Sequence, residues 1–255
     1  MSALMAERLT LALGARSFCC DFTQVFAAGQ IWGVLGPNGS GKTTLLHSLA
    51  GLRALQGGRV LLDGQPLAAL PARTRAQRLG ILLQESSTAF PAPVRECALL
   101  GRHPHLAPWQ WESPADWQRV DAALAAVDLD RLAQQDQSTL SGGERQRLKL
   151  ATLMVQEPAI WLLDEPTNHL DLHHQVGLLA QLCAAVRGRG DLLLMSLHDL
   201  NLAARFCDHV LLLYGDGRVA AGPAAEFLQA EPLSALYRHP IRMLRDGERR
   251  LFVAD

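Results

Sequence analysis

A glycine-rich loop near the N-terminus constrains this chain more than any other feature. Its residues, Gly36-Pro-Asn-Gly-Ser-Gly-Lys42-Thr43, match the pattern G-x-x-x-x-G-K-[ST] and lie between an apolar run at 31–35 and a helix-like segment at 44–49. A strand, a glycine loop and a helix in this order turn backbone N–H groups and a helix N-terminus toward a phosphate. The pattern predicts that Lys42 reaches the β- and γ-phosphate oxygens of a nucleoside triphosphate and that the Thr43 hydroxyl binds Mg²⁺. The alternative is an ordinary flexible turn.

Four short apolar runs predict strands that are buried on both faces, at 31–35, 80–83, 159–163 and 192–197. Continuous rather than alternating apolar residues are typical of a parallel sheet. The runs are followed by Gly36, Gln84, Asp164 and His198. Because ligands of open α/β sheets bind outside the carboxyl ends of the strands, we expect these four ends to meet at one crevice. Leu9, Leu11 and Leu13, together with residues 59–64, predict a smaller antiparallel sheet.

Residues 86–157 are punctuated by proline and then become helical, and we interpret them as a helical subdomain inserted into an α/β core formed by 1–85 and 158–255. Ser113 is an expected N-cap, followed by Pro114 at the first helical position and an early acidic residue. Trp117 and Val120 then follow at helical spacing. The whole chain, 1–255, is predicted to form one α/β domain with a mostly parallel sheet.

Two carboxylates, Asp164 and Glu165, directly follow the apolar run at 159–163. Adjacent residues at a strand end point in different directions, so Asp164 could support Mg²⁺ while Glu165 polarises an attacking water. The alternative for this pair alone is an ordinary acidic turn.

Besides the glycine loop, residues 140–144 predict a second helix N-terminus that could bind an anion. Their sequence is Leu140-Ser-Gly-Gly-Glu144, and an amphipathic segment follows at 145–154. Ser141 and Glu144 have the spacing of a capping box, and the two glycines allow a ligand close to the helix N–H groups. Many helices begin this way without a ligand. The sequence leaves open whether such a ligand would belong to the chain's own site or to that of another copy.

Composition excludes several classes of protein. The 255 residues carry 24 Lys+Arg against 25 Asp+Glu, and a net charge of −1 gives no electrostatic case for binding nucleic acid. No apolar run approaches the roughly 20 residues of a membrane helix, and Glu7 and Arg8 interrupt the region where a signal peptide is apolar. Five scattered cysteines fit a reducing compartment. The sequence predicts no metal site at four of the histidines, because their pairings lack a third ligand at suitable spacing: His103, His105, His173 and His174.

One ordered set of motifs resembles the ATP-binding cassette (ABC) ATPase family over nearly the whole chain: the phosphate loop, Gln84, Leu-Ser-Gly-Gly at 140–143, Leu162-Leu-Asp-Glu165, Asn168-His-Leu-Asp171 and His198. The resemblance implies ATP as ligand, held by Gly36, Pro37, Asn38, Gly39, Ser40, Gly41, Lys42, Thr43 and Thr44. It implies Mg²⁺ near Thr43, Gln84 and Asp164, and catalytic roles for Glu165 as base, His198 as γ-phosphate sensor and Gln84. It also implies a head-to-tail homodimer in which Ser141, Gly142, Gly143 and Glu144 contact the nucleotide of the other copy, with Asp171 at the dimer seam.

Three segments are similar to ATPases that power uptake of iron-siderophore complexes, haem and cobalamin: residues 101–105, 170–175 and 198–205. This branch implies two copies of a membrane permease, an extracytoplasmic substrate-binding protein, and a peripheral position on the cytoplasmic face of the inner membrane. The alternative is a soluble cassette module that regulates a macromolecule without a permease. No residue identifies the cargo.

Two aromatic features add to this interpretation. Trp109, Trp111 and Trp117 are candidates for a permease anchor, with core packing as the alternative. The family usually places an aromatic residue against adenine about 23 positions before the loop. Here that position holds Leu13, with Phe18 nearby.

Overall fold

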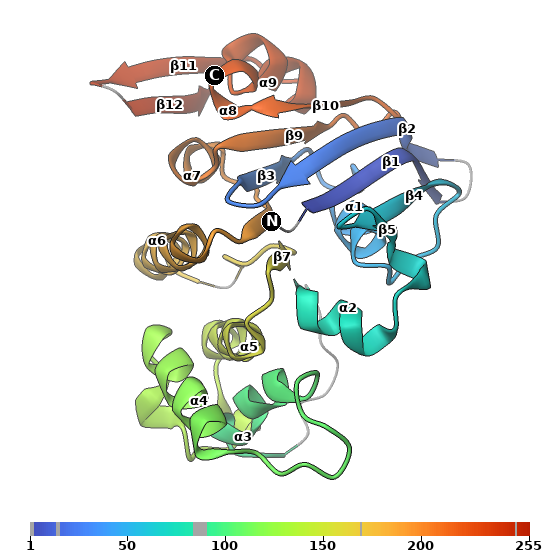
Figure 1. Cartoon of the computed structure of the whole chain (residues 1–255). Helices are drawn as coiled ribbons and strands as arrows, with labels where there is room; N and C mark the ends of the chain where they lie inside the picture. The colour runs from blue at the N-terminus through green and yellow to red at the C-terminus, as the bar shows by residue number, and fades with distance from the viewer. Residues whose placement is uncertain (1–2, 14–15, 84–90, 169, 248) are drawn as a thin grey trace.

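The computed structural model describes residues 3–13, 16–83, 91–168, 170–247 and 249–255. Within these ranges the chain is an α/β protein with a central, mostly parallel sheet, a separate antiparallel sheet and a group of helices at the opposite end (Figure 1). The fold class predicted from the sequence is confirmed. The division of the chain at residues 86 and 157 stays a prediction.

The central sheet has the strand order β10-β9-β3-β8-β7-β6. Its members are β3 (Ile31–Leu35), β6 (Leu79–Leu82), β7 (Ile160–Leu163), β8 (Leu192–Ser196), β9 (His209–Leu213) and β10 (Val219–Pro223). All neighbours pair in parallel except β9 and β10, which are antiparallel. The predicted strands are therefore correct to within about one residue. Because β3, β8 and β7 are adjacent, the loops that follow them lie at one edge of the sheet.

The second sheet is antiparallel, with the order β2-β1-β4-β5, and confirms the predicted membership of the N-terminal leucines and residues 59–64 in one smaller antiparallel sheet. It consists of β1 (Ala3–Leu13), β2 (Arg16–Ala27), β4 (Gly57–Leu62) and β5 (Gln65–Pro66). Helix α1 (Lys42–Leu49) starts in the glycine loop, and α2 (Ala72–Arg78) leads into β6.

Three helices form the lower end of the molecule in Figure 1: α3 (Val94–Leu99), α4 (Pro114–Ala126) and α5 (Gly142–Gln156). Both predicted N-caps are present as full capping boxes. The Ser113 hydroxyl accepts from the Asp116 N–H at the start of α4, and Ser141 does the same for Glu144 at the start of α5. These bonds satisfy backbone donors that a helix start otherwise leaves unpaired, which is why the helices begin at these residues.

The remaining elements follow β7. Helix α6 (Leu172–Arg189) leads into β8, and α7 (Leu200–Phe206) into β9. After β10 come α8 (Ala224–Phe227), α9 (Ala230–Tyr237) and a terminal hairpin of β11 (Ile241–Asp246) and β12 (Arg249–Ala254). Among the described residues, no helix combines the length and the apolar character needed to cross a bilayer.

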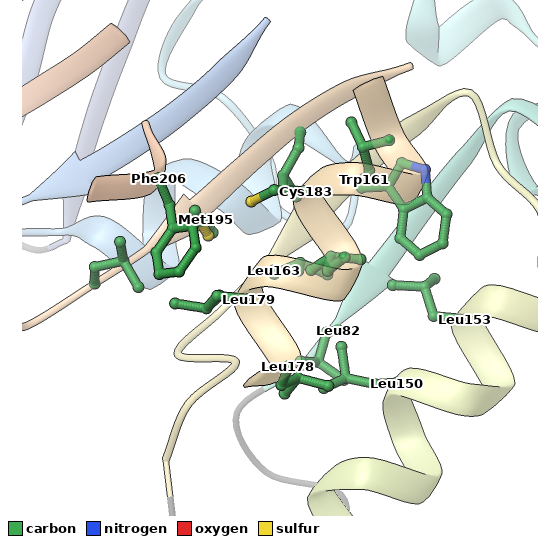
Figure 2. Packing of buried hydrophobic residues seen from close by; sticks show 14 of the residues in the cluster. Leu82, Leu150, Leu153, Trp161, Leu163, Leu178, Leu179, Cys183, Met195 and Phe206 are labelled. Atoms are coloured by element: carbon green, nitrogen blue, oxygen red, sulfur yellow. The ribbon is translucent and has the colours of Figure 1, made fainter. Parts of the chain in front are cut away.

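Two buried clusters lie on opposite faces of the central sheet. One joins α1 and the antiparallel sheet to alternate residues of β3 and β8, such as Trp32 and Leu194. The other packs the helices of the lower end and α6 against the remaining face, and Figure 2 shows Leu150 of α5 close to Leu82. Because α5 shares this core with the strands, its N-terminus has a defined place relative to the end of β7.

The three tryptophans of the helical region have different environments. Trp109 and Trp111 are 99% and 87% exposed. Core packing is therefore the wrong interpretation for these two. Trp117 packs against the buried cluster, and the Arg95 guanidinium lies 4.6 Å from its ring centroid.

Candidate functional site

The glycine loop connects the carboxyl end of β3 to the first turn of α1. Gly41 is the residue before the helix and has φ +102°, a conformation that side chains other than glycine rarely adopt. A Cβ on Gly41 would lie 2.8 Å from the Phe18 side chain, so the loop needs glycine here for space as well. This geometry leaves the start of α1 open to an anion.

Lys42 lies in the first turn of α1 and is largely buried. Its ammonium donates to the carbonyl oxygens of Gly36 at 2.8 Å and of Pro37 at 3.3 Å, so the side chain folds back along the loop. Burial lowers the pKa of the Lys42 ammonium, and the negative charges of Glu165 and Asp164 oppose that shift. The cation is therefore held inside the loop, at the place where a phosphate would be bound.

Asp164 at the end of β7 is fully buried and is held by the next strand. Its Oδ1 accepts from the Ser196 hydroxyl at 2.7 Å, and the same hydroxyl accepts from the Glu165 N–H at 2.8 Å. Asp164 Oδ2 is buried and has no hydrogen-bond partner among the described residues. A buried carboxylate oxygen without a partner is costly unless a ligand or ion satisfies it.

Glu165 points away from Asp164, as expected for adjacent residues at a strand end. Its Oε1 lies 2.6 Å from His198 Nε2, and Oε2 accepts from the Asn168 amide. The Glu165 side chain is only 11% exposed, whereas that of His198 is 44% exposed. Glu165 has φ +50°, which is unusual for a residue with a side chain and marks local backbone strain.

These groups surround one cleft of about 590 Å³. Its lining combines part of the glycine loop and the start of α1 with the ends of two other strands, and consists of Phe18, Asn38, Gly39, Gly41, Lys42, Thr43, Thr44, Glu165, Asn168 and His198. Thus the structure brings together the loop, Glu165 and His198. Of the other predicted loop residues, Ser40 is buried behind the cleft wall, and its hydroxyl has no partner in the described part of the chain.

Several predicted residues do not line this cleft. Ser141 and Gly142 are exposed at the start of α5, and Glu144 accepts from the Ser141 N–H at 2.7 Å, which lowers the pKa of its carboxyl. Asp171 caps α6 by accepting from the His174 N–H, and this bond lowers the pKa of Asp171. Gln84 lies outside the described residues, and so does the side chain of Leu13.

Two histidines of the segments 103–105 and 173–174 have partners other than a metal ion. His105 Nε2 lies 2.9 Å from the Gln156 carbonyl oxygen, and His174 Nδ1 lies 2.8 Å from Asp171 Oδ1. Within the described ranges, no group of three or more His, Cys, Asp or Glu side chains is placed to hold a metal ion.

Four residues of the site neighbourhood are not among the predicted site residues, and one of them is Asn168, which belongs to a recognised motif and donates to Glu165. Phe18 was noted only for its position in the sequence, yet it is buried against Gly41 and lines the cleft. Ser196 gave no signal, because a serine at the end of an apolar strand is common. Gln146 gave a signal that was not used: it is a polar residue on the face of α5 that also carries Leu150 and Leu153.

Together, β3, the glycine loop, α1 and the acidic end of β7 define a P-loop nucleoside triphosphatase fold. A family model described as "ABC transporter" matches residues 21–168. The chain is 42% identical over 255 aligned residues to the hemin import ATP-binding protein HmuV of Pseudomonas fluorescens, with 96% of each chain covered. It is 37% identical over 237 residues to the ferric enterobactin transport ATP-binding protein FepC of Escherichia coli, covering 93% of this chain and 88% of FepC.

A solved structure of a metal-chelate type ABC transporter in an inward-facing conformation is also similar. It has a TM-score of 0.85 and 28% identity, with 100% of this chain and 98% of that chain covered. The chain therefore belongs to the ABC transporter family. As a member of that family it binds ATP and couples ATP hydrolysis to transport.

Proposed function

We propose that this chain is the ATPase subunit of an importer whose cargo is a metal chelate such as haem or an iron-siderophore complex. The observation that carries the proposal is identity of 42% and 37%, over nearly the full length, to subunits named for hemin import and ferric enterobactin transport. Cobalamin, as a cobalt chelate, belongs to the same cargo class. In this role two copies bind a pair of permease subunits at the cytoplasmic face of the inner membrane, and an extracytoplasmic binding protein delivers the cargo.

Hydrolysis is assigned to the groups that line the cleft. Lys42 and the N–H groups of the loop bind the β- and γ-phosphates. Glu165 accepts a proton from the attacking water at its carboxylate, while the Asn168 amide holds the other carboxylate oxygen in place. His198, in contact with Glu165, donates to the γ-phosphate and stabilises the charge that develops there.

Mg²⁺ fits the donor set at the ends of β3 and β7. It prefers oxygen ligands and usually takes only one or two protein groups beside substrate phosphates and waters. The buried Asp164 Oδ2 without a partner is such an oxygen, and the Thr43 hydroxyl lies in the first turn of α1. When bound, Mg²⁺ neutralises phosphate charge; Asp164 and Thr43 are the described residues that would hold it, and Gln84 is a further predicted ligand.

The second copy is proposed to close the cleft with its own Ser141, Gly142 and Gly143. This assignment is supported by the exposure of Ser141 and Gly142, which do not line the cleft of their own chain. The capping box uses the N–H groups of Ser141 and Glu144, so the N–H groups between them, of Gly142 and Gly143, are the ones assigned to a γ-phosphate. Asp171 is assigned to the seam between the copies.

The permease is proposed to dock near Trp109 and Trp111, because both side chains project into solvent. Replacing both by alanine should leave the free energy of unfolding within about 0.5 kcal/mol of the parent, since exposed side chains support little packing. The same change should weaken co-purification of the chain with its permease in detergent. Unchanged co-purification would remove these tryptophans from the docking surface.

Two variants test the assignment of the ATPase site. Glu165→Gln should bind ATP as the parent does but hydrolyse it about 10² to 10⁴ times more slowly, because it lacks the positioned base. Lys42→Ala should lose affinity for ATP. Near-normal turnover in Glu165→Gln would refute the role of Glu165. Uptake by proteoliposomes that contain the permease, offered haem or a ferric siderophore in turn, tests the cargo class, and transport of neither would contradict it.

A further inference from the structure

The left-handed backbone of Glu165 is held from both sides by hydrogen bonds. On the N-terminal side, its N–H donates to Ser196 Oγ. On the C-terminal side, its carbonyl oxygen accepts from the Asn168 N–H at 3.2 Å and from the Gln146 side-chain amide at 3.3 Å. Gln146 also donates to the Pro166 carbonyl oxygen at 3.3 Å. A residue in a sparsely populated conformation persists only when its surroundings hold it there, so these bonds set where the Glu165 carboxylate points.

Gln146 belongs to a different part of the fold from the residue that it holds. It lies in α5, five positions after Ser141, and is only 5% exposed on the buried face of that helix. The first turn of α5 is stiffened by the capping box between Ser141 and Glu144. The Gln146 amide lies about one turn from the helix start. Because a packed α-helix moves as one rigid element, a displacement of its start also displaces this amide.

This contact joins two different active sites if the proposed head-to-tail dimer is correct, and the inference rests on that proposal. The start of α5 in one copy touches the nucleotide bound by its partner. The Gln146 of the same helix touches Glu165, which acts on the nucleotide bound by its own chain. We propose that Gln146 is a positioning residue that couples the two sites. When the partner's nucleotide binds at the α5 start and shifts it, the hydrogen bond from Gln146 transmits that shift to the Glu165 carbonyl and so to the position of the base.

The coupling predicts positive cooperativity in ATP hydrolysis. A Hill coefficient above 1, with 2 as the limit for two sites, is expected for the parent chain. Loss of the Gln146 contact should misalign the base without touching the phosphate loop. Since a misplacement of about 1 Å lowers a rate by as much as about 10²-fold, kcat should fall about 10- to 100-fold while KM for ATP changes less than about twofold.

The test variant is Gln146→Met, which keeps the size of the side chain and removes both donated hydrogen bonds. The matched control is Gln156→Met in the same helix, because the Gln156 amide also donates to two backbone carbonyls, those of Ala76 at 2.6 Å and Leu79 at 3.2 Å. Among the residues that the structure describes, no hydrogen bond joins Gln156 to Glu165. A loss of helix packing alone would affect both variants alike.

Steady-state ATPase rates of the full chain over a range of MgATP concentrations give kcat, KM and the Hill coefficient for each form. We expect a reduced kcat and a Hill coefficient near 1 for Gln146→Met, with both values unchanged for Gln156→Met. Equal behaviour of the two variants would overturn it. If Gln146→Met does not fold, Gln146→Leu serves, because its side chain is also apolar and cannot donate a hydrogen bond. A parent chain that shows no cooperativity and stays monomeric with MgATP would instead refute the proposed dimer.

Discussion

Ser196→Ala tests whether the two acidic residues at the end of β7 depend on the neighbouring strand. The Ser196 hydroxyl is fully buried, donates to Asp164 Oδ1 at 2.7 Å and accepts from the Glu165 N–H at 2.8 Å. A hydrogen bond to a charged group contributes about 1.5–3 kcal/mol, and a buried N–H left without a partner costs about 1–3 kcal/mol. Both effects arise from the same hydroxyl and are therefore not fully additive. We expect a destabilisation of about 3–5 kcal/mol, which is less than the sum of the two upper limits.

Urea denaturation of the nucleotide-free chain, followed by tryptophan fluorescence, measures this change as a shift in midpoint at constant slope. The corresponding fall in Tm is about 6–20 °C, since 1 kcal/mol shifts Tm by about 2–4 °C in a domain of this size. Ser17→Ala is the control, because the Ser17 hydroxyl contacts only the exposed Cys20 thiol among its described hydrogen bonds. A loss below about 1 kcal/mol in Ser196→Ala would refute the reasoning that this hydroxyl holds the strand ends together.

Two further predictions concern the helical region, and the second has its control in α6. The Ser113 hydroxyl and, to a lesser degree, the Arg102 guanidinium lower the pKa of Asp116 from its usual 3.8. The ionised Asp116 carboxylate therefore stabilises the fold above pH 3.8, and this stabilisation is lost as the pH falls through the lower pKa of the folded state. Asp116→Asn should therefore unfold more easily than the parent at pH 7, and this difference should shrink below about pH 4; a pH-independent difference in urea denaturation would contradict it. Gly101→Ala should destabilise the chain by about 1–3 kcal/mol, because a Cβ there would lie 2.2 Å from a backbone oxygen of α5. The control is Gly188→Ala on the exposed face of α6, which should stabilise the chain by about 0.5–1 kcal/mol. Similar melting temperatures for the two alanine variants would show that the close approach at Gly101 is not tight.

Much of the architecture could be predicted because local signals agree with the tertiary fold. The apolar runs that became β3, β7 and β8 are too short and too uniformly apolar to be surface helices, and their polar ends had to meet at one edge of a parallel sheet. The capping boxes at Ser113 and Ser141 set two helix starts by bonds between residues three apart in the sequence. Patterns of this kind are visible without any long-range information.

The missed features all depend on contacts between distant parts of the chain. The conformation of Glu165 at φ +50° follows from bonds to Ser196 and Gln146, which lie 31 and 19 positions away. The place of Phe18 beside Gly41 depends on how the antiparallel sheet packs over the loop. The exposure of Trp109 could not be inferred from residue type, since tryptophan is common both in cores and at binding surfaces.

Nucleotide-dependent association tests the central claim most directly, because the account requires two copies to complete each ATP site. The measurement is light scattering coupled to size exclusion on Glu165→Gln, which should retain ATP, with and without saturating MgATP. We predict a dimer only with MgATP, and a monomer throughout for the double variant Glu165→Gln, Lys42→Ala. A Glu165→Gln chain that binds MgATP and remains monomeric, alone and in the presence of its permease, would contradict the account.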